Sequence, residues 1–110
     1  MALLLSSALY DHNVADFDFP ADLLELQRAW YAADARCEEV AASHPSARDV
    51  VAGVAEVTEE QRAELAQARA ERLDLSEKLQ RHPWWLEAGD VFTAKQALRA
   101  AARTGDTPTE

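Results

Sequence analysis

Two apolar stripes with helical spacing constrain the fold of this chain more than any other feature of its sequence. Apolar residues recur at alternating steps of three and four along the first stripe: Leu23, Leu26, Trp30, Ala33, Cys37 and Val40. The second stripe has the same kind of spacing: Leu65, Ala68, Arg72, Leu75 and Leu79. Such spacing places residues on one face of an α-helix and is typical of helices that pack lengthwise against each other. The sequence therefore predicts two long amphipathic helices.

Proline marks both ends of the first helix. Pro20 suits the first turn of a helix, because its φ is preset and it has no N–H group to satisfy. Pro45 pushes the residue before it, His44, out of the α region. We therefore predict the first helix over residues 20–43.

A capping box and another proline delimit the second helix. The segment Thr58-Glu-Glu-Gln61 has the pattern in which the two outer side chains bond each other's backbone N–H groups. Pro83 stops the helix, which we predict over residues 58–82. His82 then falls in the last turn, where the helix dipole favours a basic residue.

Shorter helices are expected before and after the second long one. Ser46 and Gly53 have the positions of a cap and a stop for one or two helical turns. Gly89 and Asp90 form a stop and a new N-cap, and a third helix is predicted from there to Arg103. Its apolar stripe is Val91, Ala94, Leu98 and Ala101.

These elements predict an all-α fold, an antiparallel hairpin of two long helices plus a short C-terminal helix. A short connection makes the two long helices antiparallel, so the start of the first lies beside the end of the second. We expect an aromatic and apolar cluster at that end of the hairpin. Its expected members are Phe17, Phe19, Leu23, Leu24, Leu79, Trp84, Trp85 and Phe92.

The third helix is too short to cover the hairpin. It would span roughly 20 Å, whereas each long helix would span roughly 36 Å. A second copy of the chain would close the remaining apolar surface and complete a four-helix bundle, so we expect a homodimer. The alternative is a closed monomer in which residues 46–57 cover the rest of the groove.

The helical domain is expected to occupy residues 17–103. Residues 1–16 have no clean apolar period, and we expect an N-terminal arm that is either poorly ordered or docked. Residues 104–110 are polar and are expected to be a disordered tail.

Net charge and cysteine content limit the classes of partner and the cellular compartment that we expect. The 110 residues include 11 basic and 20 acidic side chains, for a formal net charge of −9. An acidic chain repels phosphate groups, so we expect no direct nucleic-acid partner and no membrane. No apolar run approaches the roughly 20 residues of a membrane span. The lone Cys37 cannot form an internal disulfide, and we expect a cytoplasmic protein.

The residues that commonly carry catalysis or bind metals are too far apart to act together. Cys37 and His44 share a helix face but lie two turns, roughly 10 Å, apart. His44 and His82 fall at opposite ends of the hairpin, and the sequence has no Glu-x-x-His or His-x-x-x-His motif. We therefore expect no catalytic residue, no metal site and no cofactor.

Trp84 and Trp85 are the most distinctive pair in the sequence. Trp is enriched at binding hot spots, so both are candidate partner-binding residues, together with Trp30 and Leu65 on the two stripes. The alternative is that Trp84 and Trp85 fill the open end of the hairpin, with unequal exposure.

Three segments together resemble short helical proteins of unknown activity from GC-rich actinobacteria: Leu23-Leu-Glu-Leu-Gln-Arg-Ala-Trp-Tyr31, Thr58-Glu-Glu-Gln-Arg-Ala-Glu-Leu65 and Arg81-His-Pro-Trp-Trp85. The resemblance covers residues from about 17 to 103 and implies no activity. The chain also matches the small all-helical chorismate mutases in size. Those enzymes resemble one another by basic and amide side chains that point into a pocket, whereas here only Arg72 looks like an inward charge.

A small protein–protein interaction module is therefore the function we expect, either homodimeric or docked on another protein. The first alternative is a small all-helical enzyme with a pocket centred on Arg72, with Arg28 or Arg69. The second is an acidic mimic of nucleic acid, because the negative charge is concentrated in the first half of the chain.

Overall fold

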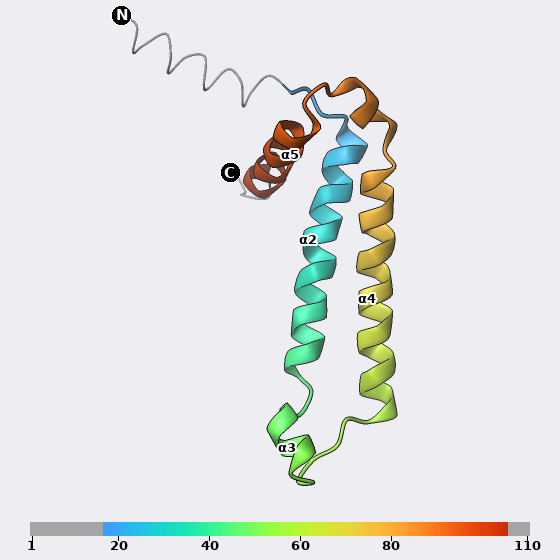
Figure 1. Ribbon diagram of the computed structural model, residues 1–110, viewed down its shortest axis with the longest axis vertical. Coiled ribbons are helices and arrows are strands. Elements are labelled where there is room, and N and C mark those ends of the chain that lie inside the picture. The colour runs from blue at the N-terminus through green and yellow to red at the C-terminus, as the bar shows by residue number, and fades with distance from the viewer. Residues whose placement is uncertain (1–16, 106–110) are drawn as a thin grey trace, which may run out of the picture. The chain divides into compact units, whose positions relative to one another are not determined.

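The computed structural model describes residues 17–105, and the arm predicted over residues 1–16 lies outside them. All regular elements of the described part are helices (Figure 1): α2 (Ala21–Ala42), α3 (Ala47–Val51), α4 (Glu59–Gln80), the 3-10 helix η1 (Pro83–Glu87) and α5 (Val91–Gly105). No strand occurs in this part of the chain, so the predicted all-α fold is confirmed. The chain divides into two compact units, residues 29–79 and residues 17–28 with 80–105.

The unit of residues 29–79 is a helical hairpin. Trp30 Nε1 on α2 donates to Ser76 Oγ on α4 at 2.7 Å, and Arg72 Nη1 on α4 donates to Asp34 Oδ1 on α2 at 2.6 Å. A step of four residues forward along α2 is therefore matched by a step of four residues backward along α4. The two long helices are packed antiparallel, as the short connection between them predicts.

Small side chains form the buried interior of this hairpin. The buried apolar residues are Ala33, Cys37, Val40 and Ala68. The larger side chains of the second stripe, Leu65 and Leu75, are only half-buried. Two helices cannot surround a shared stripe on all sides, so its bulkier residues stay in partial contact with solvent.

The capping box that the sequence predicts holds the start of α4. The Thr58 N–H donates to Gln61 Oε1 at 2.9 Å, and the Gln61 N–H donates to Thr58 Oγ1 at 3.0 Å. Both N–H groups lie before or in the first turn, where the helix itself offers no acceptor. These two bonds explain why the helix begins beside Thr58.

The short helix α3 lies at the tip of the hairpin and buries none of its residues. Ser46 Oγ accepts the Asp49 N–H at 3.1 Å, as a cap does. Gly53 follows with φ +78°, a left-handed conformation that ends the helix. Val51 and Val54 are exposed there.

The other unit joins α5 to the first turns of α2. Its buried residues are Leu23, Gln27, Ala94, Leu98 and Ala102. Asp90 caps α5, because its Oδ1 accepts the Thr93 N–H at 3.1 Å and its Oδ2 accepts the Thr93 hydroxyl at 2.8 Å. The helix continues beyond the predicted end at Arg103, where the Thr104 hydroxyl donates to the Ala100 carbonyl at 2.7 Å.

The predicted end of the second long helix is wrong. Helix α4 ends at Gln80, and His82 lies outside it in an extended conformation, with φ −62° and ψ 131°. The cause is Pro83, which disfavours the α region for the residue before it. His82 therefore gains nothing from the dipole of α4 and serves instead as the N-cap of η1.

Phe92 does not join the aromatic cluster, contrary to prediction. Its side chain is 72% exposed. The buried face of α5 contains Ala94, and Phe92 precedes Ala94 by two residues, about 200° around the helix. Because α5 begins directly after its cap at Asp90, Phe92 falls on the helix face that points to solvent.

Candidate functional site

Four aromatic rings form a cluster in the unit of residues 17–28 and 80–105. Phe17 and Phe19 stack with their centroids 5.8 Å apart, and Phe19 lies 5.1 Å from Trp84. Trp84 in turn meets Trp85 edge to face at 5.4 Å. Both tryptophans are half-buried. The cluster therefore contains both of the predicted partner-binding tryptophans of this unit.

His82 fixes this cluster to the start of α2. Its Nδ1 accepts the Trp84 N–H at 3.1 Å, and its Nε2 lies 3.0 Å from Asp22 Oδ2. A backbone N–H can only donate, so Nδ1 carries no proton and Nε2 donates to the carboxylate. This hydrogen bond is the main cause that lowers the pKa of Asp22.

The two other predicted partner-binding residues belong to the hairpin unit. Trp30 is half-buried, donates to Ser76, and meets the Tyr31 ring edge to face at 5.8 Å. Leu65 is half-buried near the start of α4. The four predicted residues thus fall in two different units, Trp84 and Trp85 in one, Trp30 and Leu65 in the other.

One side of the hairpin is closed by polar pairs. Trp30 with Ser76 and Asp34 with Arg72 lie along it, and the Asp34 hydrogen bond is the main cause that raises the pKa of Arg72. Arg72 is the inward charge that the sequence singles out. Its guanidinium is paired with Asp34. The two other arginines of the predicted enzyme pocket lie elsewhere: Arg69 is exposed, and the Arg28 Nε lies 3.5 Å from the Ala102 carbonyl oxygen.

The opposite side of the hairpin contains a hollow of about 410 Å³. Its lining residues come from α2 and α4: Ala29, Ala32, Ala33, Arg36, Glu71, Asp74 and Leu75. Ala32 and Arg36 follow Trp30 and Asp34 by two residues, about 200° around α2, which puts the hollow across the hairpin from the polar pairs. The three alanines leave the space that longer side chains would fill.

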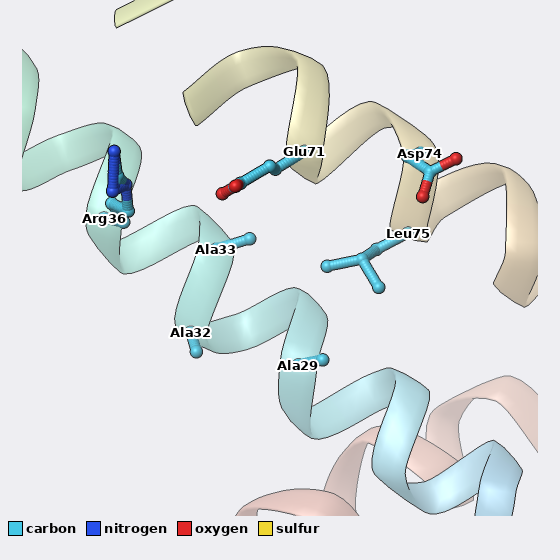
Figure 2. A pocket seen from close by; sticks show the side chains of 7 residues that line it. All are labelled: Ala29, Ala32, Ala33, Arg36, Glu71, Asp74 and Leu75. Atoms are coloured by element: carbon cyan, nitrogen blue, oxygen red, sulfur yellow. The ribbon is translucent and has the colours of Figure 1, made fainter. Parts of the chain in front are cut away.

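Charges of opposite sign border the hollow from the two helices. Figure 2 shows Glu71 and Leu75 extending from α4 toward α2, whereas Asp74 turns away. Asp74 pairs with Lys78 at 3.1 Å on its own helix. Arg36 stands on the α2 side, and its Nε is shielded from solvent without a hydrogen-bond acceptor. The hollow is therefore apolar at its base, basic on one edge and acidic on the other.

Arg36 and Glu71 were not predicted from the sequence as candidate residues. Both look like ordinary solvated charges between apolar positions. A signal was present in Ala29, Ala32 and Ala33, which mark a small-residue face adjoining the first stripe. Only the rotation of α2 against α4 shows that this face meets Glu71.

Exposed apolar side chains lie beyond the hollow as well. In the unit with α5, Leu86 is 91% exposed, close in sequence to the exposed Phe92. In the hairpin unit, Leu73 is 60% exposed. Single exposed residues of this kind are common on protein surfaces, whereas the hollow combines several apolar residues in a concave site.

Cys37 is a free thiol, buried in the hairpin. Such a cysteine behaves as a small apolar residue. Among residues 17–105, no three His, Cys, Asp or Glu side chains come together as a metal site would require. In the same part of the chain, no helix has the length and apolar character to cross a membrane.

Comparison with known proteins gives a family and no activity. Searches of curated proteins and of solved structures found no match. A family model described as a domain of unknown function, DUF8825, matches residues 22–101. The match runs from the first turn of α2 to the last turns of α5, and so includes the hairpin, the hollow and η1. The chain belongs to the DUF8825 family.

Proposed function

We propose that this protein is an interaction module that works as a homodimer, with the hollowed side of its hairpin as the dimer surface. The observation that carries the proposal is the incomplete burial of the apolar residues that line the hollow. Ala29 and Ala32 are exposed and Leu75 is only partly buried, although all three line the concave side of the hairpin. A monomeric hairpin leaves this apolar surface in water.

A second hairpin supplies the cover that the first one lacks. Four antiparallel helices surround a common core on all sides, which two helices cannot do. In the hairpin unit none of the buried side chains is larger than valine. Covering the exposed part of Leu75 and the neighbouring alanines stabilises the assembly by about 25 cal/mol for each Å² of apolar surface removed from water.

The enzyme alternative has less support from the same geometry. It needs a pocket centred on Arg72, but Arg72 is not among the residues that line the hollow and is engaged by Asp34. The hollow has apolar side chains at its base and offers no pair of groups placed for acid–base chemistry. The buried reduced thiol of Cys37 agrees with action in the cytoplasm.

Sedimentation velocity over a hundredfold range of protein concentration tests the proposal. We expect the wild type to sediment as a dimer at the upper end of the range. Leu75→Glu places a charge in the hollow and is expected to give a monomer. The matched control is Leu73→Glu, two residues away and about 200° around α4, which is expected to leave the dimer intact.

Two outcomes contradict the proposal. A wild type that sediments as a monomer throughout the range excludes the homodimer. A dimer that survives Leu75→Glu but is lost in Leu73→Glu shows that self-association uses the other side of α4. Far-UV circular dichroism of both variants establishes that each remains helical.

A further inference from the structure

We infer that the two copies are related by a two-fold axis that runs parallel to α2 and α4, so that Arg36 of each copy meets the partner's Glu71. This inference rests on the proposed homodimer and assigns its geometry. It follows from the register of the hairpin, the charges on the edges of the hollow and the shape of its base.

The register puts Arg36 and Glu71 at the same height along the hairpin. Trp30 lies opposite Ser76, and Asp34 lies opposite Arg72. Two more residues along α2 bring Arg36 opposite position 70, next to Glu71. The two charges therefore differ in height by about 1.5 Å, the rise of one residue.

Both charges lack a partner within the described part of their own chain. The Arg36 Nε is out of solvent and has no acceptor. No ion pair engages Glu71 among residues 17–105, whereas its neighbour Asp74 is held by Lys78. A shielded Nε–H group without an acceptor is costly, and a carboxylate from another molecule would relieve that cost.

The sign of the charges selects the direction of the symmetry axis. An axis parallel to the helices sets α2 against the partner's α4 and leaves each residue at the same position along the helix direction. The dimer then has two equivalent contacts, in each of which Arg36 of one copy faces Glu71 of the other. An axis across the helices sets α4 against the partner's α4. With the axis at the height of the hollow, that arrangement brings Glu71 and Asp74 toward their own copies, and like charges oppose it.

The base of the hollow suits the same arrangement. The alanines of α2 allow close approach of another helix: Ala29, Ala32 and Ala33. In the parallel-axis dimer the helix that approaches them is the partner's α4, which carries Leu75 at that height. Leu75 of each copy then lies on the alanine face of the other, and an apolar centre is bordered by two charge pairs.

Reversing each charge separately tests the pairing. Arg36→Glu places two carboxylates together at both contacts of the symmetric dimer, and Glu71→Arg places two guanidinium groups together. We expect each variant to weaken dimerisation by about tenfold or more, since like charges across an interface are strongly unfavourable. The double variant with both changes restores opposite charges and is expected to dimerise as the wild type does.

Mixing the two single variants separates pairing between chains from pairing within a chain. A heterodimer of the Arg36→Glu chain and the Glu71→Arg chain has opposite charges at both contacts. We expect the mixture to dimerise with a Kd close to that of the wild type, although each variant alone is weak. A charge pair within one chain cannot give this result, because mixing leaves each chain unchanged.

Arg69→Glu and Glu77→Arg are the matched controls, because they make the same charge changes at exposed positions that do not line the hollow. Arg36→Gln and Glu71→Gln, which remove a charge without reversing it, are expected to weaken the dimer less. If the wild type dimerises but the mixture does not, or if the controls weaken the dimer equally, the assigned geometry is wrong while the homodimer stands. If the wild type is a monomer, both proposals fail, and the hollow serves a different protein or none.

Discussion

His82 shows how much a single side chain contributes when both of its ring nitrogens are used. One nitrogen accepts the Trp84 N–H and the other donates to Asp22. The first bond caps η1 and the second holds that cap against α2. A tautomer with its proton on Nδ1 would lose the first bond, because a protonated ring nitrogen cannot accept a hydrogen bond. The two hydrogen bonds therefore select the tautomer with its proton on Nε2.

Nitrogen-15 NMR tests the tautomer of His82. We expect the Nδ1 shift of an acceptor nitrogen and the Nε2 shift of a protonated one in the folded protein at neutral pH. Asp22→Asn is expected to leave this tautomer unchanged, because the Trp84 N–H still requires an acceptor. A proton on Nδ1 in the wild type would contradict the assignment.

Among residues 17–105, two acidic side chains have lowered pKa values, and they make the fold sensitive to acid. The pKa of Asp90 is lowered chiefly by the hydrogen bond from the Thr93 hydroxyl, and that of Asp22 chiefly by His82. A carboxyl whose pKa is lower in the folded chain stabilises the fold above its unfolded pKa. That contribution is lost as the pH falls through the folded pKa.

Asp90→Asn tests this dependence, since asparagine caps a helix but does not titrate. We expect the wild type to lose more of its free energy of unfolding than the variant between neutral pH and about pH 3. Urea unfolding at the two pH values measures both losses. Equal losses in the two proteins would show that Asp90 contributes nothing to the acid sensitivity.

At the scale of the helices, the register of α2 against α4 is set by pairs on one side of the hairpin. Trp30 donates a hydrogen bond to Ser76, and Arg72 donates one to Asp34. The two pairs lie four residues apart along each helix. The buried residues between the helices are small and similar in size, and they distinguish poorly between neighbouring registers. The polar pairs have directed partners and distinguish them well.

A double-mutant cycle measures the first of these pairs. Trp30→Phe keeps an aromatic ring but removes the indole N–H, and Ser76→Ala removes the acceptor. We expect each change to lower the free energy of unfolding by about 1 kcal/mol, with little further loss when both are combined. Additive losses would show that the two side chains do not depend on each other.

The helices could be predicted closely from the sequence because their signals are local. The capping box at Thr58 and the cap at Asp90 involve side chains and N–H groups only three residues apart. The hollow could not be predicted in this way. Its edges come from Arg36 and Glu71, which are distant in sequence and come to border one hollow only through the rotation of two helices. His82 was misplaced because Pro83 ends α4 earlier than its charge pattern suggests.

At the scale of the whole molecule, the two units differ in what they bury. Leu23 and Leu98 are fully buried in the unit that contains α5. The hairpin unit has no leucine among its buried side chains. The hairpin is therefore the part of the described chain that has most to gain from a partner.

Thermal stability should then depend on protein concentration. We expect the wild-type Tm to rise by about 3 °C for each tenfold increase in concentration, because association stabilises the folded state by mass action. Leu75→Glu is expected to melt at a lower temperature that does not vary with concentration. Differential scanning calorimetry at several concentrations makes the comparison, and a constant wild-type Tm would argue against obligate association.

The helix α3 has a practical consequence, because none of its residues is buried. A peptide tag inserted after Gly53 would lengthen a connection that already lies outside the packed interior, and a longer loop costs little closure entropy. The same position offers an attachment point for a fluorophore or a crystallisation chaperone that leaves the long helices untouched.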